Sequence, residues 1–246
     1  MATIRCCGHL FQNISAVLFD KDGTLATVEN YLIALGQERT RQIDLVVPGV
    51  ANGIAAAMGI TEKMIDPTGL MAIASRKENE VAAAAYVAAT GKGWMASLSI
   101  VRAAFDCAEA QLPPKVSQTP LTVGGRSLIS QLRATEIKVG IVSSDTHAAV
   151  GEFISHHDLT SEIDWYCGAS TATPEKTAPG FLSFACTVIG QPPGQTLVIG
   201  DSAADLSLAN QGAAGFLAMV GAWRSPPVVP GAQIIIHQLS QVECFD

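Results

Sequence analysis

The sequence predicts an α/β fold in which a doubly wound parallel sheet has a helical unit inserted after its first strand. Three patterns support this prediction. From residue 119 onward, short apolar runs of strand character alternate with helical patterns, as they do in βα units. Residues 28–118 interrupt that alternation with a long, mostly helical stretch. Polar residues follow several of the apolar runs directly, and ligands bind at this end of the strands in parallel sheets.

The first predicted strand, Ala16–Asp20, ends in two carboxylates that are one residue apart. A strand alternates its side chains, so we expect Asp20 and Asp22 to share one side and to repel each other. A bound cation removes this repulsion, and Mg²⁺ prefers carboxylate oxygens as ligands. Asp22-Gly23 is also a common hairpin signal, so a plain turn is the alternative for this motif taken alone.

The inserted stretch has the apolar spacing of helix faces. We expect helices within it at 29–41, 53–58, 78–89 and 97–111. The uncharged segment 45–60 is interrupted by proline and glycine, which indicates a loop leading into a short helix. A proline-bearing linker, 112–120, returns the chain to the sheet. We therefore predict two domains: a core made of residues 1–27 and 119–246, and a helical domain made of residues 28–118.

After the linker, helices and strands alternate regularly. We expect helices at about 127–134, 148–155, 180–189 and 205–210, and strands at about 137–142, near Trp165, and at 196–200, 216–220 and 233–236. Such alternation predicts a parallel sheet whose carboxyl ends lie along one edge. Residues that follow these strands are therefore expected to lie close together.

Four further polar positions are candidates for that edge. Ser143 and Ser144 follow the strand at 137–142, and Asp201 follows the strand at 196–200. Asp205 stands where the next helix is expected to begin, a place where aspartate is also a common N-cap. Taken singly, a Ser-Ser pair is typical of a cap or turn.

One basic residue belongs to the same group of candidates. Lys176 lies in a loop between the strand near Trp165 and the helix at 180–189, from which it could reach the strand ends. Taken alone, a loop lysine is typical of solvated surface.

The order of these groups (acid pair, hydroxyl, lysine, acid pair) resembles the four motifs of the haloacid dehalogenase superfamily, in its phosphoglycolate-phosphatase-like branch. The matching residues are Asp20-Lys-Asp22-Gly-Thr24, Ser143, Lys176 and Gly200-Asp201-Ser-Ala-Ala-Asp205. The resemblance extends from about Ser15 to the C-terminus, apart from the middle of the insertion. It implies a Rossmann-like catalytic core with an inserted helical cap.

The resemblance also implies an activity, the Mg²⁺-dependent hydrolysis of a small phosphate monoester through an aspartyl-phosphate. The substrate would be phosphoglycolate-like or a sugar phosphate. By this resemblance Asp20 is the nucleophile and Asp22 is the general acid and then the general base. The implied metal ligands are Asp20, Asp22 (through its carbonyl), Asp201 and Asp205, and the implied phosphate-binding residues are Ser143, Ser144 and Lys176.

Three departures from the superfamily pattern leave the substrate open. Thr27 replaces a further acid, Thr177 replaces a proline after the lysine, and residues 122–126 replace a proline-glycine entry to the core. Basic residues of the insertion are candidate contacts for the leaving group, although solvated surface is the expected state of each: Arg39, Arg41, Arg76, Lys77 and Lys92.

The same residues have four alternative interpretations. A phosphomutase of the same superfamily shares these groups, and a catalytically inactive regulatory relative is the non-enzyme alternative. A response-regulator receiver is much shorter and carries its acceptor aspartate on a middle strand. A nucleotide-binding dehydrogenase would need a G-x-G-x-x-G after the first strand, which is missing here.

Composition limits the partners further. The 246 residues have a net charge of −7 without a basic cluster, which argues against nucleic acid as a partner. No segment is long and apolar enough for a membrane span, and residues 1–13 lack the apolar centre of a secretory signal. The six cysteines form no regular framework, which favours reduced thiols in the cytoplasm. The sequence makes no prediction of the oligomeric state.

Overall fold

The computed structural model describes residues 2–170 and 174–245. The chain divides into two compact units: Met1–Thr27 with Thr119–Asp246 form the first, and Val28–Gln118 form the second. We call them the core unit and the helical unit and describe each by itself. Among the described residues, no helix is both long and apolar enough to span a membrane.

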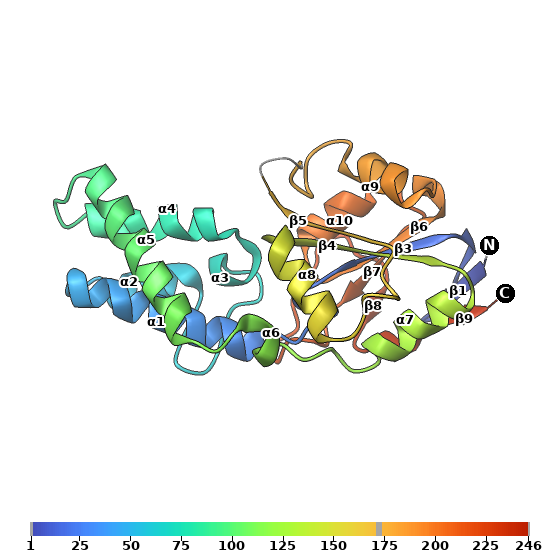
Figure 1. Cartoon of the computed structure of the whole chain (residues 1–246), viewed down its shortest axis with the longest axis horizontal. Coiled ribbons are helices and arrows are strands. Elements are labelled where there is room, and N and C mark those ends of the chain that lie inside the picture. Colours follow the sequence, from blue (N-terminus) through green and yellow to red (C-terminus); the bar gives the residue numbers. More distant parts are fainter. Residues whose placement is uncertain (1, 171–173, 246) are drawn as a thin grey trace. The chain divides into compact units, whose positions relative to one another are not determined.

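The core unit contains a six-stranded parallel sheet in the order β5-β4-β3-β6-β7-β8 (Figure 1). The central strand β3 (Ala16–Asp20) is buried along its whole length and pairs with β4 (Lys138–Thr146) and β6 (Thr196–Gly200). The outer strands are β5 (Trp165–Ala169), β7 (Gly215–Met219) and β8 (Ile235–Ile236). The prediction of a doubly wound α/β sheet is confirmed.

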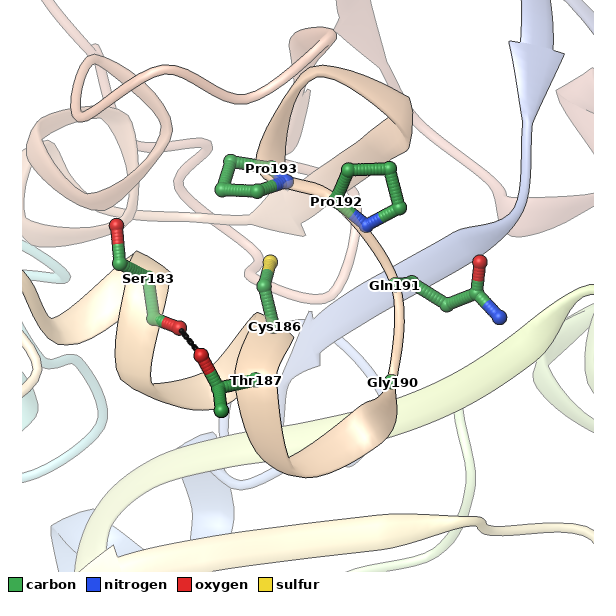
Figure 2. A pocket seen from close by; sticks show the side chains of 7 residues that line it. All are labelled: Ser183, Cys186, Thr187, Gly190, Gln191, Pro192 and Pro193. Carbon is green, nitrogen blue, oxygen red and sulfur yellow. Dashed lines mark hydrogen bonds between the residues drawn. The ribbon is translucent and has the colours of Figure 1, made fainter.

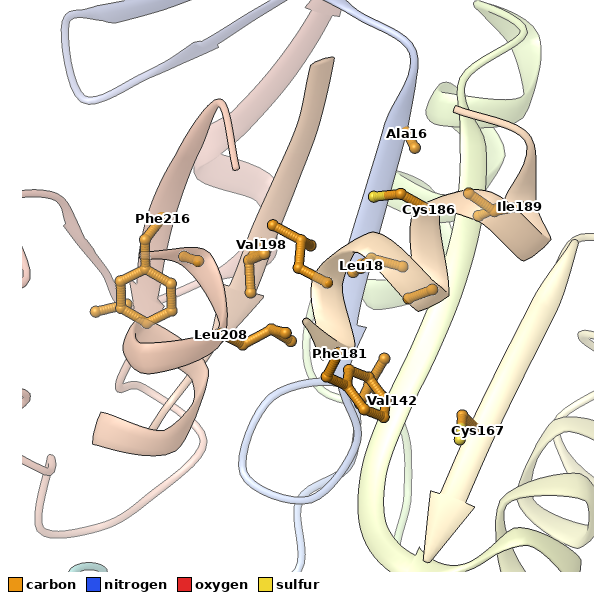
Figure 3. Packing of buried hydrophobic residues seen from close by; sticks show 14 of the residues in the cluster. Ala16, Leu18, Val142, Cys167, Phe181, Cys186, Ile189, Val198, Leu208 and Phe216 are labelled. Carbon is orange, nitrogen blue, oxygen red and sulfur yellow. The ribbon is translucent and has the colours of Figure 1, made fainter. Parts of the chain in front are cut away.

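Helices cover both faces of this sheet (Figure 1). They are α7 (Gly125–Ala134), α8 (His147–His156), α9 (Phe181–Ile189) and α10 (Ala203–Ala209). Side chains of α9 and α10 pack on Leu18 and Val198, which are neighbours across β3 and β6 (Figure 3). Gly140 of β4 lies beside Leu18, and a side chain there would overlap it. This close packing fixes β3 between its neighbours and so fixes where the strand ends.

The helical unit consists of six helices. They are α1 (Glu29–Val46), α2 (Ala51–Met58), α3 (Leu70–Ile73), α4 (Arg76–Ala88), α5 (Trp94–Gln111) and α6 (Lys115–Gln118). Their shared core contains Ile43, Ile54, Val87 and Phe105, all fully buried. Helix α1 continues into the segment expected to be a loop. Helix α4 begins two residues before its predicted start because Ser75 and Glu78 form a capping box.

A second, antiparallel sheet was not predicted. Its order is β2-β1-β9, formed by β1 (Ala2–Cys6), β2 (His9–Ile14) and β9 (Val242–Phe245). The Arg5 Nε donates to Glu243 Oε2 at 2.9 Å across β1 and β9, so this sheet ties the two ends of the chain together. Two short 3-10 turns, Pro193–Gln195 and Leu239–Gln241, complete the core unit.

Candidate active site

Three carboxylates meet at the carboxyl edge of the parallel sheet. Asp20 is the last residue of β3, Asp201 directly follows β6, and Asp205 lies in the first turn of α10. One carboxylate oxygen from each lies within 4.8 Å of the others. All three side chains are buried, at 7%, 7% and 2% exposure. Parallel pairing of β3 with β6 brings the first two together, because both strands end at the same edge.

Lys176 places its ammonium among these acids. Its Nζ lies 2.6 Å from Asp20 Oδ1 and 2.7 Å from Asp205 Oδ1. The lysine side chain is 9% exposed, so the loop before α9 directs it into the site and not into solvent. Lys176 is therefore not the solvated surface residue that a lysine in a loop usually is. The neighbouring residues 171–173 lie outside the described residues.

Asp205 is not the N-cap of α10; one of its carboxylate oxygens accepts from Ser202 and the other pairs with Lys176. Helix α10 begins at Ala203, and Ser202 is its N-cap, so the expected start at Asp205 was two residues too late. The Ser202 amide and hydroxyl donate to Asp205 Oδ2 at 3.1 and 2.6 Å. The other oxygen, Oδ1, accepts from Lys176. The capping box thus aims one carboxylate oxygen of Asp205 at the site.

Burial and mutual repulsion disfavour the charged forms of these acids. Burial raises the pKa of Asp20 to about 7; Lys176 opposes this rise, and Asp205 adds to it. Burial also raises the pKa of Asp201 well above its ordinary value, with repulsion from Asp20 and Asp205 adding to the effect. Burial alone would lower the pKa of Lys176, but Asp20 and Asp205 outweigh it and raise that pKa above its ordinary value.

Trp223 orients Asp201, and sequence reasoning missed it. The indole Nε1 donates to Asp201 Oδ2 at 2.6 Å, and the ring is 6% exposed. Gly23, with φ at +81°, lies directly against both groups, and any side chain there would overlap them. The glycine of the first motif therefore serves close packing as well as the turn. A tryptophan in a loop after β7 gives no signal in the sequence that could have identified this contact.

The remaining candidates lie around the same edge. Pairing of β4 with β3 stops at Val142, and Ser143, 7% exposed, is the next residue; β4 itself continues to Thr146, so Ser143 does not end the strand as expected. The Ser143 Oγ accepts from the Asp145 amide at 3.1 Å. Ser144 is exposed, and Asp22 is partly exposed.

One departure from the superfamily pattern has a clear structural effect. In the segment 122–126, the Thr122 hydroxyl donates to the carbonyl of Thr24 at 2.7 Å. The Thr122 amide donates to the carbonyl of Leu25 at 2.8 Å. The segment that replaces the usual proline-glycine entry therefore holds the loop that follows Asp20 and Asp22.

The basic candidates of the helical unit have their own partners. Arg39 is 5% exposed, its NH2 group lies 2.7 Å from Glu109 Oε1, and its guanidinium stacks over Phe105, so the expectation of solvated surface is wrong for this residue. Arg41 and Arg76 are exposed and pair with acids of the same unit. Lys77 and Lys92 are exposed, as expected.

A shallow pocket of the core unit lies away from the acids. It is lined by Ser183, Cys186, Thr187, Gly190, Gln191, Pro192 and Pro193 (Figure 2). These residues belong to the end of α9 and the loop that enters β6, whereas Asp201 leaves β6 at its other end. Five strand residues, about 16 Å, separate the two places. The pocket therefore has no part in the acid site.

The donor set fits a hard divalent cation. Three buried carboxylates face a single ammonium, so the cluster keeps an excess of negative charge. Carboxylate oxygens are among the ligands that Mg²⁺ takes in proteins. Burial raises the pKa values of Asp20 and Asp201, and a cation among Asp20, Asp201 and Asp205 would offset the repulsion that adds to this rise.

Comparison with known proteins identifies the family. A family model described as haloacid dehalogenase-like hydrolase matches residues 14–212. A predicted phosphoglycolate phosphatase from Haemophilus somnus has a similar structure, with 14% identity, a TM-score of 0.69 and coverage of 93% of this chain and 96% of the other. A predicted β-phosphoglucomutase from Thermotoga maritima has 15% identity, a TM-score of 0.61 and coverage of 93% and 96%.

A predicted haloacid dehalogenase-like hydrolase from Bacteroides fragilis is similar too, with 20% identity, a TM-score of 0.62 and coverage of 93% of this chain and 99% of the other. At these identities the solved structures show a common fold. No curated protein sequence matches the chain. The family model covers most of the chain and includes all four motif regions. The chain belongs to the haloacid dehalogenase-like hydrolase family.

Proposed function

We propose that the chain is a Mg²⁺-dependent phosphatase that hydrolyses a small phosphate monoester through an aspartyl-phosphate on Asp20. One observation supports this most strongly. Asp20 lies at the end of the central strand, 2.6 Å from the Lys176 ammonium and in one cluster with Asp201 and Asp205. A buried carboxylate beside fixed positive charge suits attack on an anionic phosphate, because the charges around it can offset the repulsion.

The metal has a defined role in this proposal. Asp20, Asp201 and the backbone carbonyl of Asp22 would hold Mg²⁺, with Asp205 binding through water or orienting its neighbours. The bound ion would supply positive charge that lets two anions, nucleophile and phosphate, approach each other. The Trp223 indole holds one oxygen of Asp201, and the other would be offered to the metal.

Each side chain of the site has its own role in the proposed reaction. Asp20 attacks phosphorus, and Lys176 neutralises charge on Asp20 and on the phosphoryl oxygens. Ser143 donates a hydrogen bond to a phosphoryl oxygen, and the Ser144 amide assists it. Asp22 protonates the leaving alcohol and afterwards removes a proton from the water that attacks the aspartyl-phosphate. These steps regenerate Asp20 and release inorganic phosphate.

The family and the helical unit support a proposal for the substrate class. We propose a phosphoglycolate-like compound or a sugar phosphate, in agreement with the two predicted activities among the similar structures. The helical unit would act as a cap that supplies contacts for the leaving group. The six free cysteines fit a reducing compartment, so we place the reaction in the cytoplasm.

A substrate panel tests this proposal. The purified protein is incubated with 2-phosphoglycolate, hexose phosphates and p-nitrophenyl phosphate, with Mg²⁺ or with a chelator, and phosphate release is measured. We expect Mg²⁺-dependent release that falls at least about 10³-fold in Asp20→Asn, because the amide lacks the nucleophilic oxygen charge. Asp158→Asn is the matched control, since Asp158 is exposed and its φ of +53° suits asparagine. Equal turnover by Asp20→Asn and the wild type would overturn the assignment of the nucleophile.

A phosphomutase is the second candidate, because a predicted β-phosphoglucomutase has the same fold over 93% of this chain. Incubation with a hexose 1-phosphate separates the two activities: a phosphatase releases inorganic phosphate, and a mutase forms the 6-phosphate isomer. An inactive regulatory relative would give neither product with any ester of the panel.

A further inference from the structure

A second buried lysine lies beside the acid cluster. Lys21, between the two aspartates of the first motif, is 1% exposed. Its Nζ forms ion pairs with Asp22 Oδ1 and, at 3.0 Å, with Asp145 Oδ2. The ammonium also lies 5.4 Å from the centre of the Phe153 ring, on α8. The sequence pattern assigns no function to this lysine, and the reaction described above does not use it.

The two lysines divide the acids of the first motif between them. Lys176 binds Asp20 together with Asp205, and Lys21 binds Asp22 together with Asp145. Each lysine therefore joins one acid of the first motif to an acid from another segment of the chain. The side chains of Asp20 and Asp22 are held by different cations, so the nucleophile and the acid are kept in separate environments.

The backbone of Lys21 reinforces this arrangement. Its carbonyl accepts from the Ala26 amide at 2.8 Å and from the Thr24 amide at 3.4 Å, which closes the turn that contains Asp22. On the far side of the ion pair, the Asp145 amide donates to Ser143 Oγ at 3.1 Å. Lys21 thus links the turn of Asp22 to the segment that presents the phosphate-binding hydroxyl.

We propose that Lys21 is a positioning residue that holds the Asp22 carboxylate in the direction needed for proton transfer to the leaving group. A buried ammonium is costly to desolvate and is retained only where its partners hold it well. Here it has two carboxylates and an aromatic face. This inference rests on the proposed function.

Esters with different leaving groups test the proposal. An alkyl phosphate needs a proton on its departing oxygen, whereas p-nitrophenolate leaves readily without one. The value of kcat/KM reports steps up to phosphoryl transfer to Asp20 and so isolates the departure of the leaving group. In Lys21→Met we expect kcat/KM for an alkyl phosphate to fall about 10-fold to 100-fold more than kcat/KM for p-nitrophenyl phosphate.

A double variant guards against simple misfolding. Lys21→Met leaves two acids around an apolar side chain, which can destabilise the fold. In the wild type, Lys21, Asp22 and Asp145 together carry one excess negative charge. Adding Asp145→Asn restores that net charge, while the ammonium that holds Asp22 remains absent. If Lys21→Met does not fold, the double variant provides the same measurement, and the circular dichroism spectrum and melting temperature of each variant establish that it is folded.

The outcomes separate the inference from the proposed function. A selective loss with the alkyl ester supports positioning by Lys21. An equal loss with both esters, or no loss, overturns it, because a purely structural lysine would not distinguish leaving groups. A wild type that is inactive on every ester instead rejects the proposed function.

Discussion

The core unit and the helical unit both bury charged side chains, but they balance those charges differently. In the core, Asp20, Asp201 and Asp205 surround one ammonium, from Lys176. In the helical unit, the buried Arg39 pairs with Glu109, which Arg76 also contacts. The first group has excess charge of one sign. The second is a network without net charge, in which ion pairs join three arginines to three acids: Arg39, Arg76 and Arg102 with Glu80, Asp106 and Glu109.

The pKa values report this difference. Burial raises the pKa of Asp20 to about 7 and also raises that of Asp201, with neighbouring acids adding to both shifts. Burial lowers the pKa of Arg39, but Glu109 opposes that shift and keeps the pair together. Excess buried charge is costly unless a ligand neutralises it, whereas a neutral network of ion pairs is satisfied by the protein alone. The comparison therefore separates a ligand site from a structural contact.

The largest effect is expected from removing the one cation of the acid cluster. Lys176→Met leaves three buried carboxylates without a counter-charge, so we expect the free energy of unfolding to fall by about 3–5 kcal/mol in the absence of Mg²⁺. Added Mg²⁺ should recover part of this loss, because a bound cation supplies positive charge among the same acids. Urea unfolding with and without Mg²⁺ measures both changes.

Lys138→Met is the matched control for that variant. Its ammonium lies 2.8 Å from Asp164, and its side chain is 41% exposed, so the loss should be within about 1 kcal/mol and independent of Mg²⁺. If Lys176→Met were as stable as the wild type without Mg²⁺, the excess charge in the core would carry no free-energy cost, and the contrast between the two units would fail.

A smaller effect is expected in the helical unit. Arg39→Met removes one partner of Glu109, an acid that is 35% exposed and keeps its ion pair with Arg76, so we expect a loss of about 2 kcal/mol. The kcat/KM values of the substrate panel should not change where the variant is folded, since Arg39 is committed to Glu109 and Phe105. Arg41→Met, at an exposed pair with Glu38, is the control. A selective loss of activity in Arg39→Met would assign Arg39 to the substrate instead.

The sequence identified those parts of the core that have local signals. The strand Ala16–Asp20 is continuous and apolar and ends in acids, and the structure has it with the same bounds. Asp201 and Lys176 were recognised by their order along the chain, and the structure brings both to Asp20. The helix faces of the insertion also had clear periodicity. In the core, the predicted start of α10 at Asp205 was two residues too late, because Ser202 was not recognised as the cap.

The unpredicted features depend on residues that are far apart in the chain. The contact of Trp223 with Asp201 requires the loop after β7 to fold back on the site, and no local pattern encodes that. The pair of β1 with β9 joins the two ends of the chain. Lys21 was visible in the first motif, but its burial and its contact with Asp145 exist only once β3 and β4 are adjacent. Periodicity predicts elements, and tertiary structure decides which side chains meet.

The smallest effect is a pH dependence at Asp164 of the core unit. This one acid forms ion pairs with two basic residues, Arg133 and Lys138. Burial alone would raise the pKa of Asp164, but hydrogen bonds from Lys138, the Val139 amide and Arg133 outweigh it and lower the pKa below its ordinary 3.8. The unfolded chain therefore binds the proton more readily. The stabilisation is complete above pH 3.8 and is lost as the pH falls through the lower folded value.

We expect Asp164→Asn to lose stability at neutral pH and to show a flatter acid limb than the wild type in urea unfolding measured from pH 6 to about pH 2.5. Parallel acid limbs in the two proteins would show that this cluster contributes nothing to acid unfolding.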